Sequence, residues 1–85
     1  MPSIQVYSRP GCHLCEELIE EITPLLRGRA VLEVRNIEDE PEWLAAYDTR
    51  IPVVEMDGQL VCQYRLDRGA LHRILSGTDS AYADS

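Results

Sequence analysis

The stretch YSRPGCHLCEEL, residues 7–18, decides how this chain folds. It places Cys12 and Cys15 behind a Pro-Gly pair and ahead of a run in which acidic and apolar residues recur at helical spacing. Four glutamates within the first turns suit the positive N-terminal end of a helix. The stretch therefore predicts a turn that leads into a helix, with Cys12 at the helix N-terminus and Cys15 one turn further in.

The helix that follows is amphipathic. Its apolar positions recur every three or four residues, and glutamates take the opposite face. Pro24 lacks a backbone donor, so we expect the helix to kink or loosen there, and Gly28 is expected to end it. The apolar stripe consists of Leu14, Leu18, Ile22 and Leu25.

The rest of the chain supplies three more strands and two more helices beside a first strand at 4–7. Alternating residues predict strands, Pro41 favours a helix start, and Asp57-Gly58 is a strong hairpin signal. We expect Trp43, Leu44 and Tyr47 to face inward, and Asp67 to cap the last helix. The expected elements are strand 30–37, helix 38–47, strands 51–56 and 59–64, helix 66–77, and a polar tail at 77–85 that frays.

The order is β-α-β-α-β-β-α. Strand-helix-strand connections favour parallel pairing, and the hairpin adds antiparallel strands. The sequence therefore predicts an α/β fold with a four-stranded mixed sheet flanked by helices.

Composition limits the function. The 85 residues are 45% hydrophobic and carry a net charge of −7, which argues against nucleic acid and anionic membranes as partners. No apolar run approaches the ~20 residues needed to span a bilayer, and the first residues do not read as a secretory signal. We expect a small cytoplasmic protein that acts as a monomer.

The cysteine pair has three interpretations: a structural staple, a metal clip or a redox couple. A disulfide that closes so short a loop constrains the unfolded chain little, which disfavours a staple. At a helix N-terminus, unpaired N–H groups and the helix dipole stabilise a thiolate, and Arg9 and His13 would add positive charge. Cys15 should be less exposed. An exposed attacking thiol with a shielded partner suits disulfide exchange.

Pro52 adds a second feature. It follows Ile51 where a strand should begin, on the sheet edge that carries Cys12. A cis proline there would leave the preceding backbone groups free to pair with an extended substrate.

Together, YSRPGCHLC and TRIPVV resemble the glutaredoxin branch of the thioredoxin-like superfamily over roughly residues 3–76, and the domain is expected to span residues 1–76. The resemblance implies a thiol-disulfide oxidoreductase without a bound cofactor or metal, which reduces protein or small-molecule disulfides with glutathione as co-substrate. It casts Cys12 as nucleophile and Cys15 as resolving thiol. The residues that it implies for substrate and glutathione binding are Arg9, His13, Arg50, Ile51, Pro52 and Asp67.

The chain departs from the family pattern in two places. His13-Leu14 stands between the cysteines where Pro-Tyr is usual, and VCQYRLD lacks the Gly-Gly pair that follows the hairpin. Cys62 falls near that position and is interpreted as a packing residue, with a minor chance of a redox role. Arginines at 9, 50, 65 and 68 could form a positive patch beside the cysteines.

Three alternative functions stay open at this point. One is iron-sulfur scaffolding or assembly, although the glutaredoxins that perform it typically lack a second cysteine such as Cys15. A carrier of metal ions could use the same C-x-x-C, although those domains have a different order of elements. A redox-inert module of the same fold that binds a partner protein is the third alternative.

Overall fold

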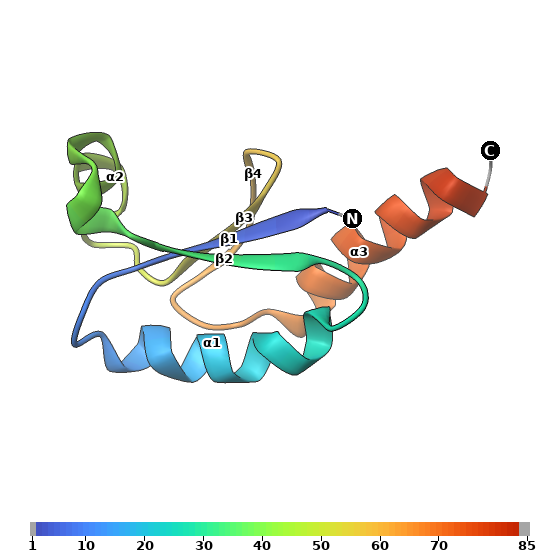
Figure 1. Cartoon of the computed structure of the whole chain (residues 1–85), viewed down its shortest axis with the longest axis horizontal. Coiled ribbons are helices and arrows are strands. Elements are labelled where there is room, and N and C mark those ends of the chain that lie inside the picture. Colours follow the sequence, from blue (N-terminus) through green and yellow to red (C-terminus); the bar gives the residue numbers. More distant parts are fainter. Residues whose placement is uncertain (1, 84–85) are drawn as a thin grey trace.

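The computed structural model describes residues 2–83, with side chains as far as Ser76. Figure 1 shows the sheet with α1 along one face and α2 near one end of the other face. The elements are β1 (Ser3–Ser8), α1 (His13–Leu26), β2 (Val31–Asn36), a 3-10 turn η1 (Ile37–Asp39), α2 (Pro41–Tyr47), β3 (Val53–Met56), β4 (Gln59–Gln63) and α3 (Arg68–Ala83).

The sheet is mixed, as the sequence predicts. Its strand order is β2-β1-β3-β4, in which β1 runs parallel to β2 and antiparallel to β3. Asp57 and Gly58 join β3 to β4 with φ angles of 53° and 80°, the left-handed values that a tight hairpin turn requires. The order β-α-β-α-β-β-α and the thioredoxin-like fold are confirmed.

The main core lies between the sheet and the helices α1 and α3. Side chains alternate along a strand, so Ile4 and Val6 of β1 point to this face while Tyr7 points to the other. From α1 the core takes every third or fourth residue, as the amphipathic pattern predicts. The buried members from the two helices are Leu18, Ile22, Leu26, Leu71 and Leu75.

A smaller core lies under α2. Tyr7 stacks on Tyr47 with ring centroids 4.3 Å apart and meets the edge of Trp43 at 5.5 Å. The prediction that Leu44 faces inward is wrong, because its side chain is 38% exposed. Trp43 and Tyr47, four residues apart, form the packed face of this short helix, and Leu44 lies beside that face.

Two further expectations differ from the structure. Leu14, expected on the buried stripe of α1, is 46% exposed, because the buried face of α1 runs through Cys15, Leu18, Ile22 and Leu26 and leaves Leu14 at its edge. The last helix does not end near residue 77 but continues to Ala83, and Ala81 and Ala83 are good helix formers. Residues 84–85 of the predicted tail lie outside the described residues. Pro24 lies within α1, which ends two residues later.

Candidate redox site

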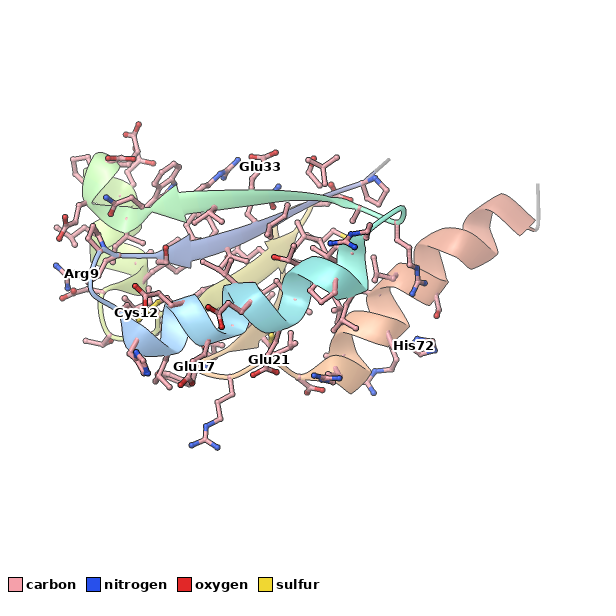
Figure 2. All side chains as sticks on the ribbon, turned by 60° about the horizontal axis from the view of Figure 1, so that its bottom comes forward. Arg9, Cys12, Glu17, Glu21, Glu33 and His72 are labelled. Atoms are coloured by element: carbon pink, nitrogen blue, oxygen red, sulfur yellow. A yellow bond between two sulfur atoms is a disulfide. The ribbon has the colours of Figure 1, made fainter. Side chains whose placement is uncertain are left out.

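The cysteine pair lies where β1 passes into α1. Gly11 adopts a φ of 81°, which favours glycine, and the turn brings Cys12 to the N-cap position. Figure 2 shows Cys12 at the N-terminal end of α1. Its Sγ forms a disulfide with Cys15 and accepts a hydrogen bond of 3.2 Å from the Cys15 N–H. The sulfur therefore lies at the positive end of the helix, where a thiolate is stabilised.

The two cysteines differ in exposure. Cys15 is 1% exposed and packs beside the main core, whereas Cys12 is partly exposed. The predicted asymmetry between an accessible sulfur and a shielded one is confirmed. Cys12 is therefore the more accessible of the two sulfurs.

The loop before β3 lies beside the cysteine turn. Tyr7 pairs with Val53 across β1 and β3, so the segments that carry Ser8 and Pro52 meet at the same edge of the sheet. The Ile51–Pro52 bond is cis. The Pro52 carbonyl accepts a hydrogen bond of 2.8 Å from the Tyr64 N–H. Within residues 2–83, no backbone hydrogen bond uses the N–H or C=O of Ile51.

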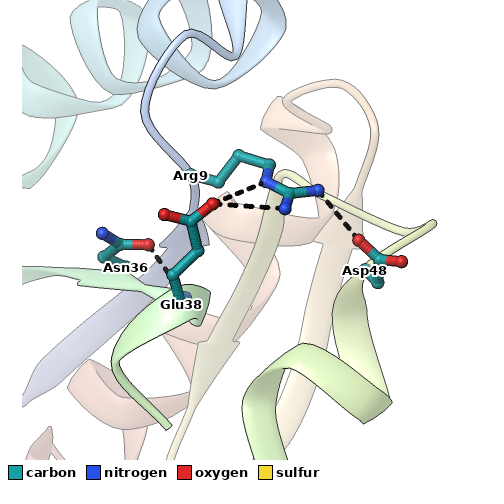
Figure 3. Close-up of polar contacts among 4 residues, drawn as sticks. All are labelled: Arg9, Asn36, Glu38 and Asp48. Atoms are coloured by element: carbon teal, nitrogen blue, oxygen red, sulfur yellow. Dashed lines mark hydrogen bonds and ion pairs between the residues drawn. The ribbon is translucent and has the colours of Figure 1, made fainter. Parts of the chain in front are cut away.

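Arg9 ties the cysteine turn to the opposite layer. Its Nη1 donates to Asp48 Oδ1 at 2.9 Å, and its Nη2 contacts Glu38 Oε2 at 3.2 Å (Figure 3). Asn36 Oδ1 in turn accepts from the Glu38 N–H at 2.9 Å. The guanidinium that the resemblance assigns to glutathione thus lies between two carboxylates of the chain itself.

We expect Arg9→Met to lower the free energy of unfolding by about 0.2–1 kcal/mol, because ion pairs this exposed are largely screened by solvent. Urea unfolding at low salt measures the loss, which should shrink as salt is added. Arg73→Met, on the exposed face of α3, is the matched control. An unfolding free energy equal to that of the unmodified chain at low salt would show that the contacts of Arg9 do not hold the turn.

The other predicted arginines and His13 are spread around the site. His13 is 82% exposed and its Nε2 lies 3.3 Å from Glu17 Oε1. Arg50 Nε donates to Gln63 Oε1 at 2.9 Å, and its guanidinium lies over the ring of Tyr47. Arg68 lies 3.7 Å from Glu21. The positive patch expected beside the cysteines is therefore interleaved with carboxylates.

Asp67 caps the last helix, as predicted. Its Oδ1 accepts a hydrogen bond of 2.9 Å from the Ala70 N–H, and its carbonyl accepts from Leu71 at 3.0 Å. The side chain of Asp67 thus satisfies one of the open donors in the first turn of α3.

We expect Asp67→Ala to cost about 0.5–2 kcal/mol of unfolding free energy, since the N-cap acceptor is lost, and Asp67→Asn to cost less. Urea unfolding measures both. The asparagine variant also separates the two roles of the residue. If Asp67→Asn unfolds normally but needs more glutathione for half-maximal rate, the carboxylate acts on glutathione as the resemblance implies. Equal losses for alanine and asparagine would contradict the cap.

Cys62 is a core residue. It is 8% exposed and pairs with Val54 across β3 and β4. Burial raises the pKa of its thiol, although a hydrogen bond with the Asp67 backbone opposes the shift. This burial confirms the interpretation of Cys62 as a packing residue. A buried neutral thiol is also a poor nucleophile.

The sequence did not reveal two large exposed side chains, one in the first turn of α1 and one after β4. Leu14 and Tyr64 are each 46% exposed. Tyr64 adopts a φ of 69°, which is uncommon for a residue other than glycine, and it lies near the position where the family pattern has glycines. The signal available in the sequence was a tyrosine in VCQYRLD near the place where the family pattern has glycines.

The described part of the chain has neither a membrane-spanning helix nor a group of metal ligands. In residues 2–83, no helix is long and apolar enough to cross a membrane. Across the same residues, no three side chains of the His, Cys, Asp and Glu types are grouped so that they could hold a metal ion.

The fold and the cysteine pair together define a small protein of the thioredoxin-like class. The chain belongs to the glutaredoxin-like domain family (DUF836), whose model matches residues 3–76. It is similar to the solution structure of protein Ne2328 from Nitrosomonas europaea, with 33% identity and a TM-score of 0.77. The similarity covers 86% of this chain and 89% of that one. A comparison with curated proteins finds no match.

Proposed function

We propose that this protein is a dithiol oxidoreductase that reduces disulfides in a protein or a small molecule. The observation that carries the proposal is the bonded pair at the N-terminus of α1, with an accessible Cys12 and a buried Cys15. Such a pair suits a redox function, since its two sulfurs can exchange a bond without movement of the helix.

The reaction begins from the reduced pair. The Cys12 thiolate attacks one sulfur of the substrate disulfide, and the other substrate sulfur leaves as a thiolate. Cys15 then attacks the Cys12 sulfur in this mixed disulfide, which releases the second substrate thiol and forms the Cys12–Cys15 disulfide. The substrate gains two electrons and the protein loses two. Two thiols, such as two molecules of glutathione, return the pair to the dithiol state and become a disulfide themselves.

The groups around the pair support these steps. The Cys15 N–H that contacts Cys12 Sγ can donate to a thiolate there, so we expect the pKa of Cys12 to lie below the ordinary thiol value of about 8.5. The open N–H and C=O of Ile51 can align an extended substrate across the sulfur. Glutathione is the co-substrate that the family resemblance favours, and cytoplasm is the compartment in which such a dithiol stays reduced.

The test measures three quantities on the purified chain: the Cys12/Cys15 reduction potential, the pKa of Cys12 from thiolate absorbance, and turnover of hydroxyethyl disulfide with glutathione. We expect a lowered pKa and turnover. An ordinary thiol pKa without turnover would contradict the proposal. Tight stoichiometric binding of Zn²⁺ or Cu⁺ without turnover would favour the metal carrier instead.

A further inference from the structure

The strand β2 forms an open edge of the sheet. It stands first in the order β2-β1-β3-β4, so it is paired only on the side of β1. None of its six residues is buried, whereas four of the six residues of β1 are. Figure 2 shows Glu33 at the margin of the sheet, with no described element beyond β2. An edge of this kind presents backbone donors and acceptors with which another strand can pair.

Every second residue of β2 directs its backbone groups away from β1. The Val31 N–H donates to the Pro2 carbonyl at 2.8 Å, so the backbone groups of Val31 point toward β1. β2 pairs with β1 without a shift in register, and the direction of the N–H and C=O groups alternates along a strand. The N–H and C=O of Leu32 and Val34 therefore point outward, and within residues 2–83 no turn or loop hydrogen bond uses them.

The opposite edge of the sheet, β4, is irregular by contrast. Its register with β3 shifts between Val54 and Glu55, and Tyr64, just after β4, adopts a φ of 69°. Irregularities of this kind twist an edge strand and hinder its pairing with another sheet. β2 contains no proline and no such shift. Of the two edges, β2 is therefore the one suited to accept a further strand.

The side chains of β2 are complementary to a second copy of the same strand. Val34 is 52% exposed, although it lies on the face of the main core and is paired with Val6. Glu33 and Arg35 lie on the other face, 3.1 Å apart, and their side chains are 42% and 33% exposed. An antiparallel pair of β2 strands centred on Val34 places Glu33 of each copy directly opposite the partner's Arg35.

Backbone direction and charge together select this register. Outward-pointing residues of one copy must face outward-pointing residues of the other, which leaves Glu33 and Arg35 as the neighbouring centres. Those registers place two carboxylates or two guanidinium groups directly opposite each other, which is destabilising. The register centred on Val34 pairs opposite charges twice and brings the two Val34 side chains into contact.

From this charge complementarity we infer that β2 is the interface of a weak symmetric dimer, in which two sheets join through their β2 strands. A two-fold axis beside Val34 relates the copies, and the backbones of Leu32 and Val34 supply hydrogen bonds between them. Six residues on each side form a small interface, so the association is weak and depends on concentration. The dimer replaces the monomer that the sequence predicts.

The dimer is independent of the proposed function. β2 contains neither cysteine of the redox pair. β1 runs parallel to β2, so the ends of β1 that lead to Cys12 point in opposite directions in the two copies. Loss of the dimer therefore does not contradict the oxidoreductase, and loss of turnover does not contradict the dimer.

Sedimentation velocity from about 1 µM to about 1 mM chain measures the association. At about 0.15 M salt the Debye length is about 8 Å, which damps the repulsion between two chains of net charge −7 but not the contacts between opposed side chains. We expect the mass to rise with concentration from that of one chain toward that of two. Amide exchange at Leu32 and Val34 should slow by about tenfold when about nine-tenths of the chains are paired. A mass of one chain at every concentration overturns the inference.

Val34→Lys locates the interface. It places two ammonium groups opposite each other at the two-fold axis, at a position exposed enough for the chain to fold. We expect dimer affinity to fall at least about tenfold. Leu60→Lys, at a side chain 51% exposed in β4, is the matched control and should leave the affinity unchanged. A dimer that survives Val34→Lys, or that only Leu60→Lys abolishes, overturns the inference.

An exchange of charges tests the register. Glu33→Arg alone would face the partner's Arg35, and Arg35→Glu alone would face the partner's Glu33, so each variant should lose the dimer. An equal mixture of the two should regain it as a heterodimer, because opposite charges then meet at both positions. Two folded variants that do not associate in the mixture overturn the inference. If Arg35→Glu does not fold, the comparison of Val34→Lys with Leu60→Lys decides.

Discussion

We expect Cys12→Ser to remove disulfide exchange altogether. A serine hydroxyl is not ionised at neutral pH even at a helix N-terminus, so no nucleophile remains at the accessible position. The rate with hydroxyethyl disulfide and glutathione should fall to the uncatalysed background, a loss on the order of a thousandfold or more. Cys62 cannot replace it, because that thiol is buried and its pKa is raised by burial.

Cys15→Ser is the informative companion to this variant. It keeps the attacking thiol but cannot resolve the mixed disulfide, so it should accumulate a covalent adduct with the substrate in a ratio of one to one, visible by mass spectrometry. Cys62→Ser is the control and should retain full turnover. If Cys12→Ser formed the adduct and Cys15→Ser did not, the roles of the two cysteines would be reversed.

The sequence predicts best what depends on neighbouring residues. The α1 helix with Leu18 and Ile22 buried, the Asp57-Gly58 hairpin and the Asp67 cap are all determined within a few residues, and each is found in the structure. The position of the cysteines followed from the same local signals. The fold order then followed from connectivity rules, which need no knowledge of side-chain contacts.

The rest of the site depends on residues far apart in the sequence. Arg9 meets Glu38 and Asp48 only after α2 has packed over the sheet, so its ion pairs could not be predicted from its place near the cysteines. A groove of about 420 Å³ likewise has both Leu14 and Tyr64 in its lining, although these residues are far apart in the sequence. Helical periodicity suggested that Leu14 would be buried, but it did not show that the buried face would be centred on Cys15, Leu18, Ile22 and Leu26.

Ile22→Ala should cost about 2–5 kcal/mol of unfolding free energy, the usual range for a fully buried isoleucine. Its side chain is 0% exposed in the main core, and α1 there supports the segment that holds Cys15. At several degrees per kcal/mol for a domain of this size, the midpoint of thermal unfolding should fall by roughly 10–30 °C. Calorimetry measures this loss of stability. The controls Ile22→Val and Leu14→Ala should lose less unfolding free energy, because valine leaves a smaller cavity and Leu14 is 46% exposed. A loss for Ile22→Ala no larger than for Leu14→Ala would mean that α1 is not packed against the sheet as described, and the shielding of Cys15 would fall with it.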